Sequence, residues 1–358
     1  MEPRRKTRAV NIGGMQIGGN SPVSIQSMTK TDTRDVESTV KQINALAEAG
    51  CEIVRAAVPN TAAAEALKEI KKRVALPVVA DIHFDYRLAL AALENGADKL
   101  RLNPGNIGGR ENIKKVAEAA KSRGVPIRVG VNSGSVEKDL AEKYCGKAPD
   151  SMADALAESA LRNVEILESF NFSDIVIAVK ASSVPVSIKA YEIIAQKTDY
   201  PLHVGITEAG AAYAGTIKSA AGIGAILSRG IGDTIRVSLT GDPIQEVYCA
   251  KEILKSLGLR RFGVEFVSCP TCGRTGIDLT GAVSRIEEYC KTLNANIKVA
   301  VMGCAVNGPG EARDADIGLA GGSGSAVIFK KGRVLKTVNE REMVDVFIEE
   351  LRKAASNG

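Results

Sequence analysis

Short runs rich in β-branched residues recur along the first two-thirds of this chain, and a helical pattern follows each of them. The runs are residues 23–28, 52–58, 77–83, 99–103, 126–131, 174–182, 202–207 and 233–239. Amphipathic, alanine-rich stretches between them include 36–49, 62–74, 113–123, 153–170 and 184–196. Such alternation is typical of a parallel α/β fold. Eight units over roughly 240 residues favour a closed (β/α)8 TIM barrel over an open doubly wound sheet.

The chain changes character on either side of this pattern. Residues 10–19, with two pairs of glycines, predict a hairpin that plugs the N-terminal end of the barrel. After residues 255–262 the expected order is strand, helix and three further strands, and then a closing helix at 340–354. We therefore predict two domains, a barrel over 1–257 that binds the substrate and a smaller α+β domain over 258–358. The second has about 100 residues, a common domain size.

Composition excludes several classes of protein. The excess of 47 Lys and Arg over 42 Asp and Glu gives a charge of +5, which suits an anionic small molecule or an acidic partner but is too weak to indicate nucleic acid. Residues 9–29 are uncharged but too rich in polar residues and glycine to span a membrane. Seven cysteines, an odd number, argue against a disulfide framework and favour the reducing cytoplasm.

Charged, amide and hydroxyl side chains stand at the C-terminal ends of the predicted barrel strands, where barrels of this kind build their active sites. They are Arg55, Asp81, His83, Arg101, Asn103, Arg128, Asn132, Lys180, Ser182, Thr207, Glu208, Arg236 and Ser238. Any one arginine here could be part of an ordinary ion pair. Five cations at equivalent positions would repel one another unless an anion lay between them, so the ring predicts a site for a phosphorylated or diphosphorylated compound.

The acids and histidines of this ring are candidates for proton transfer. Glu208 could donate or accept a proton, or it could simply pair with an arginine. Asp81 and His83 are two residues apart on one strand and should face the same way. Catalysis by His83 is the less favoured interpretation, since a histidine at a strand end is often only hydrogen-bonded. His203 begins a strand, at the opposite end of the barrel, and is predicted to be structural.

Three cysteines of the second domain, Cys269, Cys272 and Cys304, predict a metal or redox site. A structural zinc site would need a fourth cysteine or histidine in a comparable motif, and this domain has no histidine. A dithiol would use the Cys269–Cys272 pair and leave Cys304 without a role. An iron–sulfur cluster accepts thiolates from separated loops and tolerates a non-cysteine ligand on one iron.

The fourth ligand of such a cluster is left open by the residues alone. Glu311 follows Cys304 on a loop rich in glycine and proline, but by composition it is better interpreted as a solvated carboxylate. Cys290 is a rival for the same position. Cys51, Cys145 and Cys249 have no partner motif and are most simply small buried apolar residues.

Six segments of the chain resemble the family of bacterial 4-hydroxy-3-methylbut-2-enyl diphosphate synthases in its two-domain form. They are SIQSMT at 24–29, ADIHF at 80–84, RLNPG at 101–105, HVGITE at 203–208, CPTCGR at 269–274 and GCAVNGPGE at 303–311. They extend over nearly the whole chain, and the last two are specific to the family. The resemblance implies an oxidoreductase of the methylerythritol phosphate route to isoprenoids.

The resemblance also implies a cofactor and a substrate. A [4Fe-4S] cluster would be held by Cys269, Cys272 and Cys304, with Glu311 as the ligand of the fourth, unique iron. The substrate would be 2-C-methyl-D-erythritol 2,4-cyclodiphosphate, whose ring is opened and dehydrated by two electrons after an oxygen of the substrate replaces Glu311 on that iron. The polar residues of the barrel mouth would bind its diphosphate, and Glu208 would handle a proton.

The resemblance further implies partners. Reduced flavodoxin or ferredoxin, both acidic, would supply the electrons. A homodimer would let the cluster of one subunit serve the barrel mouth of the other. Two rivals stay open on the residues alone: an iron–sulfur sensor without catalysis, which has no use for a ring of cations, and a phosphosugar lyase with a structural metal.

Overall fold

Eight parallel strands close into a barrel in the computed structural model, which describes residues 1–144, 151–304, 310 and 312–356. The strands are β3 (Ser24–Met28), β4 (Ile53–Ala57), β5 (Val78–Asp81), β6 (Lys99–Leu102), β7 (Ile127–Asn132), β8 (Ile175–Lys180), β9 (His203–Val204) and β10 (Thr234–Ile235). Their order is β8-β7-β6-β5-β4-β3-β10-β9, and a parallel bridge between Ile177 and Leu202 joins the last strand to the first. The predicted barrel is confirmed.

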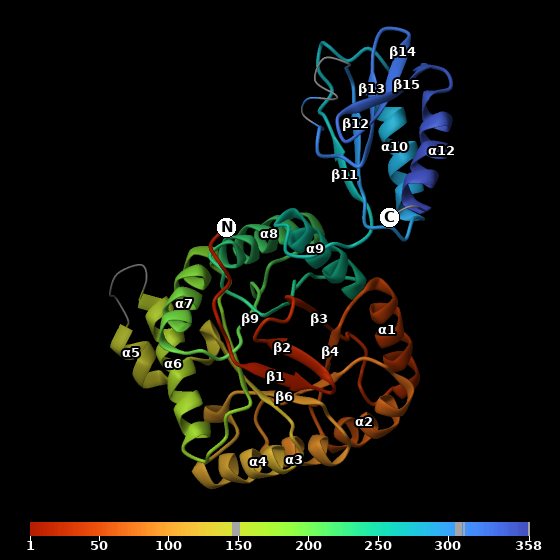
Figure 1. The fold of residues 1–358 in the computed structure, drawn as a ribbon. Coiled ribbons are helices and arrows are strands. Elements are labelled where there is room, and N and C mark those ends of the chain that lie inside the picture. The colour runs from red at the N-terminus through yellow and green to blue at the C-terminus, as the bar shows by residue number, and fades with distance from the viewer. Residues whose placement is uncertain (145–150, 305–309, 311, 357–358) are drawn as a thin grey trace. The chain divides into compact units, whose positions relative to one another are not determined.

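Helices surround the barrel on its outer side (Figure 1). They are α1 (Val36–Ala49), α2 (Thr61–Arg73), α3 (Tyr86–Glu94), α4 (Arg110–Ser122), α5 (Lys138–Tyr144), α6 (Ser151–Glu168), α7 (Val184–Lys197), α8 (Ala212–Ser228) and α9 (Pro243–Ser256), with short 3-10 turns at Pro104–Asn106 and Ser133–Ser135. Their starts follow from the sequence, because Asp35 and Asn60 accept backbone N–H groups at the beginnings of α1 and α2. The helices cover the strands so fully that all of β8 is buried.

A hairpin of β1 (Ala9–Ile12) and β2 (Met15–Gly18) lies across one end of the barrel (Figure 1). Val10, Ile12 and Ile17 are buried against side chains near the starts of three barrel strands. The hairpin therefore plugs the N-terminal end, as predicted, and leaves the opposite end for ligands.

Residues beyond the barrel form a second compact unit, Arg261–Gly358, separate from Met1–Arg260. Its sheet has the order β11 (Glu265–Ser268), β12 (Lys298–Met302), β13 (Ile317–Gly321), β14 (Ser325–Lys330) and β15 (Arg333–Asn339). The first three strands are parallel and the last two antiparallel. Helices α10 (Leu279–Lys291) and α12 (Met343–Ser356) pack against the sheet around a core of aliphatic side chains.

One strand of this unit is missing from the sequence prediction. We expected two strands between the Cys304 loop and the closing helix, but β15 adds a third, Arg333–Asn339. Its residues are mostly exposed, so the hydrophobic alternation that marks a half-buried strand is weak. The mixed α and β composition predicted for this unit is confirmed, whereas the functions assigned to the two domains stay predictions.

Candidate active site at the barrel mouth

A cavity of about 260 Å³ opens at the C-terminal ends of the barrel strands. Its lining residues are Arg55, Asp81, His83, Arg101, Arg128, Asn132, Lys180, Thr207, Arg236 and Ser238. All ten belong to the set that the sequence places at strand ends, and the parallel strands bring them together because their C-terminal ends meet at one mouth. That these residues bind a substrate stays a prediction.

Three residues of the predicted set do not line this cavity. The side chain of Asn103 is buried and caps a short turn by accepting a hydrogen bond from Gly105 N at 3.1 Å. Ser182 and Glu208 are exposed. Glu208 has a φ of 52°, a left-handed conformation uncommon outside glycine, so its backbone position is constrained by its surroundings.

Asp81 is the carboxylate inside the cavity, and three neighbours surround it. It accepts a hydrogen bond from Arg101 Nη1 at 3.2 Å and lies 3.9 Å from Arg55 Nε. His83 Nε2 is 3.3 Å from its other oxygen. Burial acts to raise the pKa of Asp81, but Arg55, His83 and Arg101 outweigh it and hold that pKa well below its usual range. Asp81 is therefore ionised and orients the two arginines.

Positive charge still exceeds negative charge in the cavity. Burial, reinforced by Arg55 and Arg101, lowers the pKa of Arg128 well below its ordinary value. Burial is also the largest cause of the lowered pKa of Lys180, followed by Arg128 and Arg236. Nε and Nη2 of Arg128 have no hydrogen-bond partner among the described residues. Buried cations that depress one another's pKa in this way are suited to bind an anion, which would relieve the repulsion.

Glu246 supports this cavity from behind and is absent from the set of residues predicted from the sequence. It is 1% exposed on α9, where it accepts hydrogen bonds from Ser27 Oγ at 3.0 Å and Leu239 N at 3.2 Å. Its carboxylate also lies 3.4 Å from Arg236 Nη2 and 3.5 Å from Lys30 Nζ. The sequence does contain a sign that Glu246 is buried. It falls on the apolar face of its helix, three residues after Pro243 and four before Ala250. An acid on such a face should have a buried partner.

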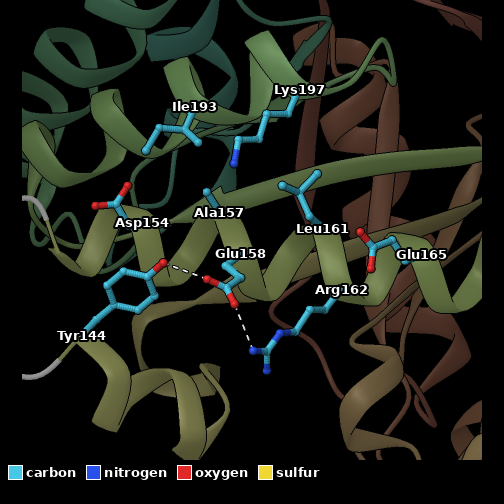
Figure 2. Close-up of a pocket in the computed structure, with 9 residues that line it drawn as sticks. All are labelled: Tyr144, Asp154, Ala157, Glu158, Leu161, Arg162, Glu165, Ile193 and Lys197. Atoms are coloured by element: carbon cyan, nitrogen blue, oxygen red, sulfur yellow. Dashed lines mark hydrogen bonds and ion pairs between the residues drawn. The ribbon is translucent and has the colours of Figure 1, made fainter.

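A larger cavity, about 360 Å³, lies along α6 and α7 on the outside of the barrel (Figure 2). It is lined by Tyr144, Asp154, Ala157, Glu158, Leu161, Arg162, Glu165, Ile193 and Lys197. At its centre Glu158 accepts hydrogen bonds from Tyr144 Oη at 2.7 Å and Arg162 Nη2 at 2.9 Å (Figure 2). This cavity presents a carboxylate that is already paired, and its lining holds three acids, Asp154, Glu158 and Glu165, against two cations, Arg162 and Lys197. The mouth is therefore the better candidate for an active site.

Two cysteines of the second unit, Cys269 and Cys304, lie at one edge of its sheet. β11 and β12 are parallel, so Cys269, after the first, and Cys304, after the second, lie at the same edge. Gly303 N donates a hydrogen bond to Cys269 Sγ at 3.0 Å, and Gly276 N donates to Gly303 O at 3.0 Å. These bonds join the two loops that carry the thiols.

Cys272 is the exposed thiol of this group. Its loop is ordered by a hydrogen bond from Cys272 N to Thr275 Oγ1 at 3.1 Å. A backbone N–H from Arg274 is the largest cause that lowers the pKa of Cys272, so its thiolate is favoured. Glu311 lies outside the described residues. Within the described residues, no three His, Cys, Asp or Glu side chains are placed to hold a single metal ion.

The rival ligand Cys290 lies in a different environment. It is buried at the C-terminal end of α10 in the hydrophobic core, and burial raises its pKa to about 11. Cys290 lies eleven positions along α10 from its first residue, Leu279, which is a rise of about 16 Å along the helix axis. A buried thiol of raised pKa in an apolar core is a poor ligand for iron. Cys51 and Cys249 are buried in the barrel unit, and Cys145 lies outside the described residues.

Comparison with known protein families divides the chain in the same way. Residues 7–251 match the model described as the GcpE TIM-barrel domain, and residues 265–353 match the model described as the GcpE protein C-terminal domain.

Curated proteins named 4-hydroxy-3-methylbut-2-en-1-yl diphosphate synthase (flavodoxin) are similar over nearly the whole chain. The protein from Clostridium perfringens is 58% identical over 346 residues, which is 97% of this chain and 98% of its own length. Those from Caldanaerobacter subterraneus and Bacillus subtilis are 57% and 56% identical over 350 residues, 98% of this chain and 98% and 91% of their own lengths.

Solved structures resemble the barrel at much lower identity. Dihydropteroate synthase from Stenotrophomonas maltophilia has a TM-score of 0.51 at 13% identity and covers 70% of this chain and 98% of its own. The enzyme from Coxiella burnetii has a TM-score of 0.50 at 12% identity, with 70% and 99% covered. At these identities the likeness shows the barrel fold alone.

Proposed function

The chain belongs to the GcpE family, and we propose that it forms 4-hydroxy-3-methylbut-2-enyl diphosphate, the product for which its relatives are named. It is accordingly an oxidoreductase of isoprenoid synthesis, and flavodoxin is its electron donor, with ferredoxin as the alternative. The substrate is 2-C-methyl-D-erythritol 2,4-cyclodiphosphate. The observation that carries the proposal is the cavity of five converging cations, since a small cyclic diphosphate matches both its charge and its volume of about 260 Å³.

The residues of the mouth bind and orient this substrate. Arginine forks suit pairs of phosphate oxygens, and Lys180 adds a point charge. Asn132, Thr207 and Ser238 present shorter polar groups to the hydroxyls and remaining oxygens. Asp81 binds no anion itself, because it repels phosphate, but it holds Arg101 and Arg55 in place. Asn103, Ser182 and Glu208 would reach the substrate only after local rearrangement of the rim.

The thiols of Cys269, Cys272 and Cys304 are proposed to hold a [4Fe-4S] cluster, with Glu311 on the fourth iron. The donor set fits, because the three thiols lie on two loops that hydrogen bonds join, and Gly303 N–H donates to the sulfur of Cys269. When bound, the cluster would supply electrons and an iron with a replaceable ligand. Carboxylate is a harder ligand than thiolate and exchanges more readily for a substrate oxygen.

We propose that the site is shared in a homodimer, in which the second unit of one subunit serves the barrel mouth of the other. The barrel unit ends at Arg260, whose Nη1 donates to Val23 O at 3.0 Å and contacts Glu52. Both partners lie where barrel strands begin, so the chain leaves the barrel at the end opposite the mouth. Mixed subunits carrying Arg55→Ala and Cys272→Ser should regain activity, and mixtures that stay inactive would contradict the shared site.

The compartment proposed is the cytoplasm. The described cysteines are free thiols, which fits a reducing environment. Among the described residues, every helix is too short or too polar to cross a membrane.

Anaerobic purification followed by iron and sulfide analysis tests the proposal. Protein with about four irons and four sulfides per chain should convert the cyclodiphosphate when dithionite and a mediator dye are supplied. Arg128→Ala should lose substrate binding while keeping its iron, whereas Arg162→Ala, a surface control on α6, should keep both. A colourless, iron-free protein that still acts on phosphosugars would favour a lyase instead. An iron-containing protein that does not bind the cyclodiphosphate would favour a sensor.

A further inference from the structure

Lys99 is a buried amine for which the reaction has no assigned use. It is the first residue of β6 and is 0% exposed. Its Nζ finds no hydrogen-bond partner among the described residues, and it does not line the mouth cavity. A charged ammonium without a partner in such an interior would be strongly unfavourable.

The charged groups that act on Lys99 come from the adjacent strand β7 and from β4, which lies beyond β5, and both are cations. Arg128 on β7 and Arg55 on β4 act on it, and Lys99 in turn acts on His203 of β9. Asp81 on β5 is the carboxylate of these strands, but it is already committed to Arg101 and Arg55. Burial first, and then Arg128 and Arg55, lower the pKa of Lys99 well below 10.5.

We propose that Lys99 is an uncharged amine in the ligand-free protein and that it takes up a proton when a dianion binds in the mouth cavity. The proton comes from solvent and converts the amine to an ammonium, with no bond broken. Burial disfavours the ammonium most, and repulsion from Arg128 and Arg55 adds to it. An anion among these two arginines cancels the repulsion and attracts the ammonium, so the charged form is favoured more than in the free protein. Lys99 is thus a positioning residue that acts through these two arginines and not by touching the substrate.

The benefit of this proton to the reaction rests on the proposed function. The cyclic diphosphate carries two negative charges. When the ring opens, one carbon–oxygen bond to phosphate breaks, two electrons and one proton enter, water leaves, and the product carries three charges. A buried amine that has become an ammonium offsets the additional negative charge of the product.

The predicted linkage has a definite sign. Because binding takes up a proton, the affinity for a dianion should fall as the pH rises above the pKa of Lys99 in the free protein, by up to about tenfold per pH unit. Lys180 lines the cavity, and burial lowers its pKa too, so proton uptake by the wild type includes any proton that Lys180 binds. The difference between the wild type and a Lys99 variant therefore isolates Lys99.

Calorimetric titration of the complete protein, without reductant, measures this proton. The probes are 2-C-methyl-D-erythritol 2,4-cyclodiphosphate and sulfate, neither of which titrates near neutral pH. Titrations in buffers of different ionisation enthalpy give the number of protons taken up per site. We expect the wild type to take up about one proton more than Lys99→Met. Lys72→Met, which removes an exposed lysine bonded to Glu69, is the matched control and should behave as the wild type.

Three results would overturn the proposal. They are equal proton uptake in Lys99→Met and the wild type, an unchanged pH dependence of affinity in the variant, and uptake that disappears in His203→Gln instead. Lys99→Met should fold with an equal or higher Tm, because it removes an unpartnered polar group, and Lys99→Gln replaces it if it does not fold. A further outcome separates this proposal from the proposed function. If sulfate binds with proton uptake that depends on Lys99, but the cyclodiphosphate does not bind, the proposed substrate is wrong and the role of Lys99 is supported.

Discussion

Replacing Asp81 by asparagine tests whether one carboxylate holds the cations of the barrel mouth together. Its side chain is 5% exposed and that of Arg101 is 10% exposed, so both charges are largely removed from water. Asparagine has nearly the same shape but no charge, and it leaves Arg101 and Arg55 without their counter-ion. Breaking a buried pair by removing one partner costs about 3–5 kcal/mol, and we expect a loss of that size.

Urea unfolding followed by circular dichroism measures the loss. The chain has two compact units, so the relevant transition is the one that sulfate stabilises in the wild type. Sulfate should stabilise Asp81→Asn more than the wild type, because an anion among the arginines replaces part of the missing charge. Asp85→Asn is the control, since Asp85 lies four residues away and caps α3, where asparagine caps equally well. It should cost less than about 0.5 kcal/mol.

The same carboxylate predicts a dependence on pH. The pKa of Asp81 is lower in the folded protein than in the unfolded chain, so its contribution is fully present above the unfolded value of about 3.9. It is lost as the pH falls below that value towards the folded pKa. The stabilities of the wild type and Asp81→Asn should therefore converge in acid. A loss below about 1 kcal/mol at neutral pH, equal to that of the control, would refute the idea that Asp81 organises the cations.

Three further perturbations test other parts of the structure. Glu246→Gln removes the charge that faces Arg236, so it should lower the free energy of unfolding in urea by about 1.5–3 kcal/mol and weaken sulfate binding. An unchanged midpoint of urea unfolding would contradict the supporting role of Glu246. Gly205→Ala would place a methyl carbon 2.4 Å from the carbonyl oxygen of Arg236, so it should lower the free energy of unfolding by about 1–3 kcal/mol. An unchanged free energy of unfolding would mean that the backbones at Gly205 and Arg236 move apart easily. Cys272→Ser should lose iron after anaerobic reconstitution while Cys290→Ser keeps it, and the reverse would exchange their assignments.

The residues of the mouth could be recognised from the sequence because their position depends on strand order alone. Once eight strand–helix units are assigned, every strand end must lie at one mouth, and Arg55 and Arg236 meet there although they are far apart in the chain. The hairpin that plugs the barrel could also be predicted from a local pattern. Its paired glycines mark a tight turn, and its apolar residues needed a buried surface.

Hydrogen bonds to nearby backbone groups explain why the predicted set of mouth residues included some that do not line the cavity. Asn103 follows its strand as expected, yet its side chain is used to cap the next turn. Asparagine readily bonds to nearby backbone N–H groups, and such contacts are decided by local dihedral angles that a strand pattern does not specify. A strand pattern also failed to predict β15. Its exposed residues show little hydrophobic alternation, and its pairing with β14 depends on tertiary contact.

By itself the sequence determined the barrel, the mixed second unit and the identity of the polar groups at the mouth, because hydrophobic periodicity and strand direction act over short stretches of chain. Only the tertiary structure decided how the charges balance. Glu246 reaches Arg236 from a helix outside the barrel, and Lys99 lies among cations from strands β4 and β7 without a carboxylate partner among the described residues. A pKa depends on burial and on charges a few ångströms away, and neither can be assigned until distant segments have packed together.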